Sequence, residues 1–480
     1  MIRTRIAPSP TGKDVHIGSV ATALMNFAWA KKNGGQFIIR IEDTDQSRLV
    51  PGGEAKMLQT LQELGIVADE SPVIGGPYAP YRQSERLDKY KKHAEELVTK
   101  GKAYYCTCTS ERLSEMRTKQ QAEKKVPKYD RYCLNRQEEV KKEIAGGTKY
   151  VVRLLIPERE IIFTDLIRGE VRFNSSNLDD QVLLKSDGFP TYHLGVVVDD
   201  HLMQITHVLR GEEWLPSTPK HIILYDAFGW EKPFFGHVSL LRNPDKSKLS
   251  KRKNPVWASE YIEKGIFPEA LLNYLALMGW SHPEGKEIFD LREYINVFDI
   301  KDIQTTAPVF DVTKLEWMNG EYIRNSKLET LNSKIYKYIG DKYDSVVVEK
   351  SIPLIRERIK KLSDYLPLTE FLFKAPDKYE IDLSSKKEIF TNIYNVLDKI
   401  KNNNVPISPD SKFEDVISWK AESIGYVLTQ LAQESGLKNS EFFMMLRVAI
   451  TGKKVSPPLN ESMEIVGKDE CLKRINALAI

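Results

Sequence analysis

The sequence R-T-R-I-A-P-S-P-T-G-K-D-V-H-I-G, residues 3–18, decides the fold of the first part of the chain. Its first residues alternate as in a short strand, and the prolines and glycine of P-S-P-T-G end that strand in a tight turn. Apolar, helix-forming residues then run almost unbroken from Ser19 to Lys32, and Asn33-Gly34-Gly35 ends this helix. A second alternating stretch begins at Phe37. This order predicts the first half of a doubly wound α/β domain, which binds nucleotides at the carboxyl ends of parallel strands.

His16 and Gly18 lie at the start of the predicted helix. The first backbone N–H groups of a helix have no partner within it, so they can hold a nucleotide phosphate. A glycine there lets a ligand approach the backbone, and a histidine can donate a hydrogen bond to a phosphate oxygen as charge builds up. The alternative interpretation is that His16 only caps the helix and Gly18 only relieves packing.

A second motif far along the chain favours the phosphate-binding interpretation. Lys248-Leu249-Ser250-Lys251-Arg252 places three cations and a hydroxyl in five residues. A lysine cluster alone is usually a solvated loop. Together with H-I-G-S, however, it resembles the paired signatures of class I aminoacyl-tRNA synthetases, which in other members read HIGH and KMSKS. The segment from Arg5 to Gly18 and the I-E-D-T-D at 41–45 resemble, more narrowly, the glutamyl-tRNA synthetases of bacterial type.

The resemblance covers essentially the whole chain, because further sequence blocks agree with it. These blocks are residues 80–86, 187–200, 210–214 and 317–320. It implies an α/β fold: a Rossmann-like nucleotide-binding domain split by a mixed α/β connective insertion, then a stem-contact domain and an all-α anticodon-binding domain. The expected limits are 1–86 and 186–251 for the catalytic domain, 87–185 for the insertion, 252–324 for the stem-contact domain and 325–480 for the anticodon-binding domain.

Three local patterns add to this outline. We predict a strand from Thr191 to Val198, closed by Asp199-Asp200, and one packed helix from Tyr261 to Trp280 that ends at Gly279. From Asn325 onward the apolar residues recur at helical spacing, without strand alternation long enough for a β-barrel. By resemblance, this absence favours the bacterial type, because glutaminyl-tRNA synthetases and eukaryotic-type glutamyl enzymes carry β-barrel anticodon domains.

The resemblance also assigns site residues position by position. For ATP binding and catalysis it implies His16, Gly18, Glu213, Trp214, Lys248, Ser250 and Lys251. For glutamate binding it implies Arg5, Ala7, Ser9, Glu42, Tyr192 and Arg210. For the tRNA anticodon it implies Arg358 and Arg447.

The chemistry of these residue types suits the implied roles. A free amino acid needs its ammonium and carboxylates paired when they leave water, and the planar fork of an arginine such as Arg210 can pair with a carboxylate in two places. The alternatives are that Arg5 and Glu42 simply pair on adjacent strands and that Trp214 only packs. Some relatives have an asparagine where Val196 stands, so that substrate contact is absent or supplied elsewhere.

The cysteines indicate a metal site or plain thiols. Four cysteines in a chain of 480 residues are not a disulfide framework. Cys106 and Cys108 form a C-x-C, and Cys133 follows, with Tyr129 four residues before it. Three thiolates could hold zinc (Zn²⁺). The family's zinc-bearing members use a similar spacing, some with a histidine where Asn135 stands, and Tyr129 resembles the phenolate ligand of a shortened relative. Bound zinc and reduced thiols both remain open.

The composition and the apolar pattern make some other classes of protein less suitable. The chain carries 70 lysines and arginines against 67 acidic residues, a net charge of +3, so an RNA surface must come from local charge segregation. No apolar run approaches the roughly 18 residues of a membrane span, and the start shows no charged-then-apolar leader. We therefore expect a cytoplasmic protein without a membrane segment.

The function implied by the resemblance is glutamate–tRNA ligation. The enzyme would use ATP and Mg²⁺ to convert L-glutamate to glutamyl-adenylate, transfer the glutamyl group to the 3′ end of tRNA-Glu, and act as a monomer. We find no nucleophile triad, so catalysis should come from positioning and charge stabilisation. The alternatives are an enzyme that also charges tRNA-Gln, a small-molecule adenylyltransferase, and a non-catalytic RNA-binding paralogue. The last two fit less well, because the chain has a helical C-terminal half and keeps the motif residues.

Overall fold

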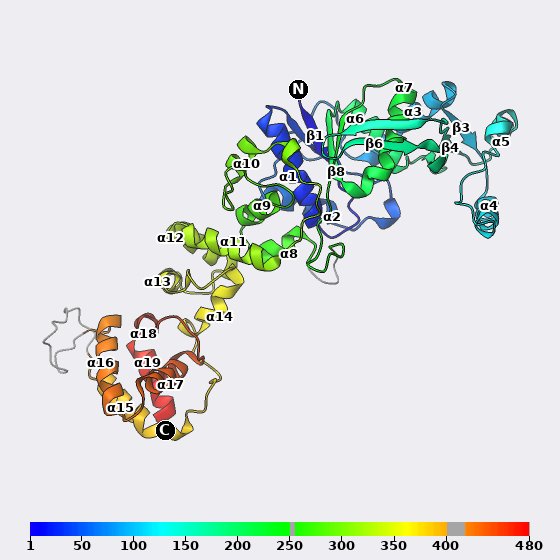
Figure 1. Cartoon of the computed structure of the whole chain (residues 1–480). Helices are drawn as coiled ribbons and strands as arrows, with labels where there is room; N and C mark the ends of the chain where they lie inside the picture. The colour runs from blue at the N-terminus through cyan, green and yellow to red at the C-terminus, as the bar shows by residue number, and fades with distance from the viewer. Residues whose placement is uncertain (250–254, 401–417, 480) are drawn as a thin grey trace. The chain divides into compact units, whose positions relative to one another are not determined.

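The computed structural model describes residues 1–249, 255–400 and 418–479, which form two compact units (Figure 1). The first unit comprises residues 1–263 and 268–312, and the second comprises 264–267 and 313–480. This division does not test the finer one into four domains, which stays a prediction. None of the helices in the described ranges has both the length and the apolar character that crossing a membrane requires.

The first part of the chain forms the predicted strand, turn, helix and strand. These elements are β1 (Arg3–Ile6), α1 (Ile17–Lys32) and β2 (Gln36–Ile39), followed by α2 (Gly53–Glu63). β1 and β2 are parallel, and Gly34 ends the helix with a φ of 62°, a conformation that glycine adopts without strain. α1 is buried along most of its length because it packs on β1, β2 and β8.

A four-stranded sheet with the order β6-β5-β9-β8 continues the nucleotide-binding fold. Its strands are β5 (Glu160–Asp165), β6 (Gly169–Asn174), β8 (His207–Gly211) and β9 (Phe234–Val238). β8 and β9 are parallel, and the N–H of Thr206 donates to the carbonyl of Arg3, so β8 lies beside β1. β5 and β6 belong to the stretch predicted as an insertion, yet they extend this sheet.

The remainder of the predicted insertion is mixed α/β, as expected. It contains α3 (Leu87–Thr99), β3 (Ala103–Cys106), α4 (Ser110–Ala122), α5 (Gln137–Ala145), β4 (Val151–Leu154) and β7 (Val182–Leu184). The strands form a separate antiparallel sheet with the order β3-β4-β7. The first unit also contains α7 (Thr218–Phe228), α8 (Ala258–Glu263), α9 (Pro268–Ala276) and α10 (Leu291–Val297).

Two local predictions are wrong. The predicted strand Thr191–Val198 is the start of helix α6 (Tyr192–Leu202), whose residues Leu194 to Asp200 are all buried. An unbroken apolar run suits a buried helix as well as a buried strand, so the pattern alone did not distinguish them. The predicted helix Tyr261–Trp280 is two helices, α8 and α9, because Gly265 breaks it with a φ of 83° and an added Cβ there would lie 2.5 Å from the backbone nitrogen of Leu362.

The second unit is helical, as predicted. Its helices are α11 (Val312–Asn325), α12 (Leu328–Ile339), α13 (Ser345–Ile355), α14 (Tyr365–Thr369), α15 (Lys387–Leu397), α16 (Ala421–Glu434), α17 (Asn439–Thr451), α18 (Leu459–Val466) and α19 (Lys468–Ala479). In the described parts of residues 313–480 no strand occurs. Buried residues such as Phe390, Ile424 and Leu446 form one core among α15 to α19.

Asp199 on α6 anchors the segment P-Y-R-Q-S-E-R at 80–86. Its carboxylate is fully buried and accepts hydrogen bonds from Nε of Arg86 and Oη of Tyr90, both at 2.7 Å, and from Nε2 of Gln83 at 3.0 Å. A buried charge is tolerated only when it is paired and hydrogen-bonded. This contact fixes α6 against the segment that precedes α3.

The Asp199→Ala substitution should destabilise the protein by about 3 to 5 kcal/mol, since it leaves Arg86 buried without its carboxylate. Urea unfolding followed by circular dichroism measures the change. Glu138→Ala is the matched control, because Glu138 pairs with Lys141 on the surface, where a change of no more than about 0.5 kcal/mol is expected. Equal unfolding midpoints for the two variants would contradict the anchoring role.

Candidate active site

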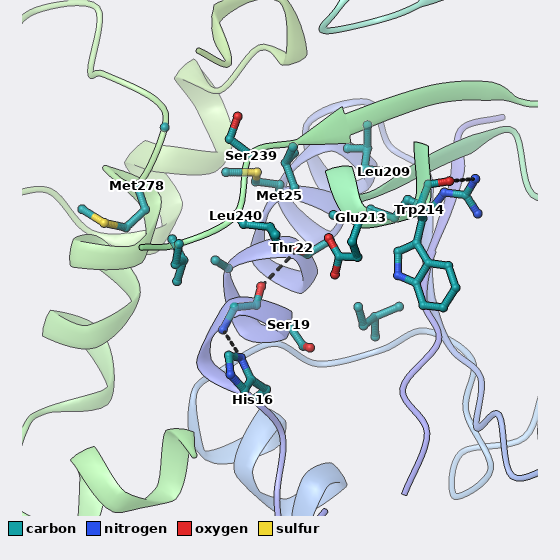
Figure 2. Close-up of a pocket in the computed structure, with 18 of the residues that line it drawn as sticks. His16, Ser19, Thr22, Met25, Leu209, Glu213, Trp214, Ser239, Leu240 and Met278 are labelled. Carbon is teal, nitrogen blue, oxygen red and sulfur yellow. Dashed lines mark hydrogen bonds between the residues drawn. The ribbon is translucent and has the colours of Figure 1, made fainter. Parts of the chain in front are cut away.

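A cavity of about 310 Å³ opens where α1 begins and where β1, β8 and β9 end. The carboxyl-end residues of these strands, Ile6, Gly211 and Val238, line it. Figure 2 shows His16, Ser19 and Thr22 following one another along α1, with Glu213 and Trp214 contributed by the segment after β8. This is the place at which a doubly wound sheet binds nucleotides.

The structure brings most of the predicted substrate residues to this cavity. Those that line it are Arg5, Ala7, His16, Gly18, Glu42, Tyr192, Arg210, Glu213, Trp214 and Lys248. Ser9 is exposed and is not among the described residues of the lining, whereas Ser250 and Lys251 lie outside the described residues.

Sequence reasoning missed several lining residues. They include Ser19, Thr22, Met25, Leu209, Ser239, Leu240, Met278 and Gln304. The sequence could have indicated only Ser19 and Thr22, because they stand one and four residues after Gly18 and so share its face of the predicted helix. In the structure, Oγ1 of Thr22 donates to the carbonyl of Gly18 at 3.1 Å. Leu209 lies within β8, a strand that was not predicted from the sequence.

His16 both caps α1 and faces the cavity. Its Nδ1 accepts a hydrogen bond from the backbone N–H of Gly18 at 3.0 Å. The structure therefore confirms that His16 caps the helix. This contact uses only Nδ1, so it does not prevent the rest of the ring from contacting a ligand. Because Nδ1 accepts, the neutral ring carries its proton on Nε2, so the imidazole is a hydrogen-bond donor at that atom.

Arg5 and Glu42 do not pair with each other. Arg5 binds Asp200 through Nε and Nη2, at 3.1 and 3.2 Å, and Arg40 binds Asp200 at 2.7 Å and Glu42 at 3.0 Å. Burial raises the pKa of Glu42, and this effect exceeds the opposing influence of Arg40. A ligand cation beside Glu42 would thus relieve an unfavourable buried charge.

Arg210 is a buried cation whose hydrogen-bond acceptors are all neutral. It is only 6% exposed, and burial lowers its pKa. It donates to Nε2 of His237 at 3.1 Å, Oη of Tyr192 at 3.1 Å, Nδ1 of His221 at 3.3 Å, Oγ1 of Thr218 at 2.8 Å and the carbonyl of Trp214 at 3.4 Å. In the described part of the chain it forms no ion pair. A buried guanidinium without a carboxylate favours an anionic ligand.

The cavity thus contains one carboxylate that lacks sufficient cationic pairing and one guanidinium that lacks an anion. A ligand that carries both an ammonium and a carboxylate would satisfy both groups. Contrary to the expectation from the sequence, the first backbone N–H groups of α1, from Ile17 to Val20, already donate to Val256 and His16 within the protein. The positive end of the α1 dipole and the Nε2 proton of His16 lie at the same cavity wall and suit a phosphate. The site can therefore hold an amino acid next to a nucleotide.

The aromatic side of the cavity is formed by Trp214 and Tyr192, whose ring centroids are 4.3 Å apart. Trp214 is 38% exposed, so it is not an ordinary packing residue. Val196, by contrast, is 2% exposed and belongs to the apolar core of the first unit. It makes no polar contact with the cavity, so the asparagine contact of some relatives is absent at this position.

The predicted thiol cluster is assembled beside the β3-β4-β7 sheet. The Sγ atoms of Cys106, Cys108 and Cys133 lie within 4.8 Å of one another, and Oη of Tyr129 is 3.4 Å from Cys106 and 3.3 Å from Cys108. Hydrogen bonding from Cys133 lowers the pKa of Cys106 to about 4, so one thiolate is already favoured. Three sulfurs and a phenol oxygen within this space are a suitable donor set for tetrahedral zinc.

The two predicted anticodon residues meet in the second unit, although they are far apart in sequence. Arg358 donates to the carbonyl of Ser456 at 2.8 Å, and Arg447 donates to Oγ of Ser456 at 2.5 Å and to the carbonyl of Pro457 at 2.9 Å. Arg358 is exposed, and Arg447 is half-buried. The two guanidinium groups form a small basic surface that could contact RNA.

Comparison with known proteins gives matches over the whole chain. Residues 1–317 match the family described as "tRNA synthetases class I (E and Q), catalytic domain", and residues 321–479 match the family described as "Anticodon binding domain". The glutamate–tRNA ligase of Acidothermus cellulolyticus is 44% identical over 100% of this chain and 95% of its own. The glutamate–tRNA ligase of Cutibacterium acnes is 45% identical over 98% of this chain and 97% of its own.

Solved structures give the same result. A glutamate–tRNA ligase from Elizabethkingia meningosepticum, solved in complex with its amino acid, has a TM-score of 0.86 and 37% identity, covering 100% of this chain and 99% of its own. A glutamate–tRNA synthetase from Elizabethkingia anophelis has a TM-score of 0.84 and 37% identity over the same shares. The likeness therefore extends through both units of the fold.

Proposed function

The chain belongs to the class I tRNA synthetases for glutamate and glutamine, and we propose that it ligates glutamate to tRNA with the cavity described above. The observation that carries the proposal is the occurrence in one cavity of Arg210, a buried cation without a carboxylate, and Glu42, a buried carboxylate with a raised pKa. Glutamate has the matching groups. Its γ-carboxylate suits Arg210 and Tyr192, and its ammonium suits Glu42.

Activation then places the α-carboxylate of glutamate toward ATP at the start of α1. An oxygen of this carboxylate attacks the α-phosphorus, and the bond to the β-phosphate oxygen breaks, which releases pyrophosphate. The Nε2 proton of His16 and the positive end of the α1 dipole stabilise the charge on the phosphate oxygens, and Lys248, which lines the same cavity, assists the departing pyrophosphate. Mg²⁺ enters as the counter-ion of ATP. A hydroxyl of the terminal tRNA adenosine next attacks the acyl carbonyl, and AMP leaves.

The other parts of the chain take the roles that the family implies. The basic surface of Arg358 and Arg447 contacts the anticodon of tRNA-Glu, and the thiol cluster holds a structural zinc that ties β3 to the loop before α5. Ser250 and Lys251, outside the described residues, belong to the ATP-binding motif. The division into catalytic, connective, stem-contact and anticodon-binding domains, the cytoplasmic location and the monomeric state are parts of this proposal.

Other functions fit less well. A small-molecule adenylyltransferase has no use for the helical second unit, and a non-catalytic paralogue has no need of the charged cavity. An enzyme that charges both tRNA-Glu and tRNA-Gln would have the same active site, since such selectivity can rest on a few contacts worth about 1 to 3 kcal/mol each.

Charging with labelled glutamate tests the function and the tRNA choice. We expect the purified enzyme, given ATP and Mg²⁺, to charge a transcript of tRNA-Glu and not one of tRNA-Gln. Arg358→Gln should raise the charging of tRNA-Gln relative to tRNA-Glu, because the arginine is the proposed anticodon contact. Charging of both transcripts by the unaltered enzyme would overturn this anticodon assignment, and charging of neither would overturn the function.

Glu42 should make glutamate binding depend on pH. Burial raises the pKa of Glu42, so as the pH falls this carboxyl takes up a proton at a higher pH than an ordinary glutamate does. The neutral form no longer pairs with the ammonium, and the KM for glutamate should rise on the acidic side while the KM for ATP stays level. Glu42→Gln should have a high KM for glutamate without this pH dependence. A level glutamate KM across the acidic range in the unaltered enzyme would remove Glu42 from the ammonium site.

Metal analysis by mass spectrometry tests the thiol cluster. We expect one zinc per chain in the purified protein and its loss in Cys133→Ala, since a structural site of this kind needs its thiolate ligands. Cys471→Ala is the control, because Cys471 is buried in the second unit and belongs to a different core. A protein that contains no zinc, or that keeps it in Cys133→Ala, would contradict the site.

A further inference from the structure

Behind Arg210 lies a buried hydrogen-bond chain to which the proposed mechanism gives no role. Nε of Arg210 donates to Nε2 of His237 on β9 at 3.1 Å, and Nδ1 of His237 is 2.5 Å from Oδ2 of Asp165 at the end of β5. His237 is 0% exposed and Asp165 is 1% exposed. Within the described residues neither one lines the cavity, so neither can touch a ligand there.

The partners of His237 allow only one form of its ring. The carboxylate of Asp165 accepts hydrogen bonds and cannot donate them, so Nδ1 of His237 must carry the proton. Nε2 then has a lone pair, which accepts from Nε of Arg210. Burial lowers the pKa of His237 and keeps a second proton off the ring. The hydroxyl of Thr218 lies 3.1 Å from the same Nε2 and also accepts from Arg210, so it supports the same arrangement.

We propose that Asp165 and His237 are positioning residues that set the orientation of Arg210, and thereby the affinity of the enzyme for the γ-carboxylate of glutamate. The inference rests on the proposed function, which gives Arg210 its ligand. Asp165 selects the tautomer of His237, and that tautomer holds Nε of the guanidinium. The two η nitrogens are then fixed in their plane, with Nη1 toward Tyr192 at the cavity wall.

Asp165→Asn gives an unusually definite test, because the new amide has only one way to fit. Oδ1 of Asp165 accepts from the backbone N–H groups of Ile167 and Arg168, both at 3.0 Å, and of His237 at 3.3 Å. The amide oxygen must keep these donors, so its NH₂ group must face Nδ1 of His237. Nδ1 then has to accept, the ring proton moves to Nε2, and two donors face each other at Arg210.

We expect Asp165→Asn to raise the KM for glutamate by about tenfold to a hundredfold, the range produced by loss of a hydrogen bond to a charged group. The KM for ATP should stay within about twofold of the unaltered value, because the proposed ATP site at the start of α1 does not include Arg210. Both constants come from tRNA-Glu charging at saturating concentrations of the other substrates. A loss of folded enzyme would lower kcat but would not change one KM alone.

A double-mutant cycle separates the tautomer from a general structural effect. His237→Gln can place an amide oxygen where Nε2 was, and it has no tautomer to set. Asp165→Asn should therefore raise the glutamate KM less than twofold in the His237→Gln background. His237→Asn, which keeps a donor toward Asp165 but has no acceptor toward Arg210, should raise the KM as much as Asp165→Asn does.

The outcomes distinguish this inference from the proposed function. If Asp165→Asn raises the glutamate KM equally in both backgrounds, the tautomer role is wrong. If Arg210→Ala raises this KM strongly while Asp165→Asn and His237→Asn leave it unchanged, the positioning role is wrong and the proposed site stands. If Arg210→Ala itself leaves the glutamate KM unchanged, the proposed glutamate site fails.

Discussion

The catalytic unit depends on the requirement that buried charges be paired. Asp200 on α6 accepts hydrogen bonds from Arg5 on β1 and from Arg40 just after β2. Asp199, its neighbour, accepts from Arg86 in the segment before α3. These contacts join elements that are separated by more than a hundred residues in the chain, and each is buried in a medium where an unpaired charge would cost several kcal/mol. The same ion pairs hold the parallel strands, α6 and the cavity wall in one arrangement.

Function arises where this pairing is incomplete. The pair Arg5–Asp200 is satisfied within the protein, but Arg210 has only neutral acceptors and Glu42 has a raised pKa in spite of its contact with Arg40. The free energy that would stabilise these two charges is left for a ligand to supply. Buried charges in a cavity whose pKa values are shifted by burial are therefore a sign of a binding site, whereas a charge paired within the protein needs no ligand to compensate it.

The sequence allowed prediction of the elements that depend on local patterns. The strand, turn and helix up to Lys32 follow from prolines, glycines and apolar spacing, and the helical second unit follows from its periodicity. Helix α6 was mistaken for a strand because an apolar run that is buried on every side has no period that distinguishes the two. The cavity residues that match motifs could be assigned by resemblance. Asp165 and His237 could not, because they are 72 residues apart and only the pairing of β5 with β9 brings them together.

The neutral surroundings of Arg210 also determine which charge a ligand of this cavity should carry. The charge preference of this cavity depends on the absence of an acidic side chain among the five groups that accept from the guanidinium. An acidic side chain beside the guanidinium would pair with Arg210 and remove the unpaired positive charge that favours an anionic ligand. The preference for an anionic ligand therefore depends on uncharged residues around Arg210, some of which, such as His237, do not themselves line the cavity in the described part of the chain.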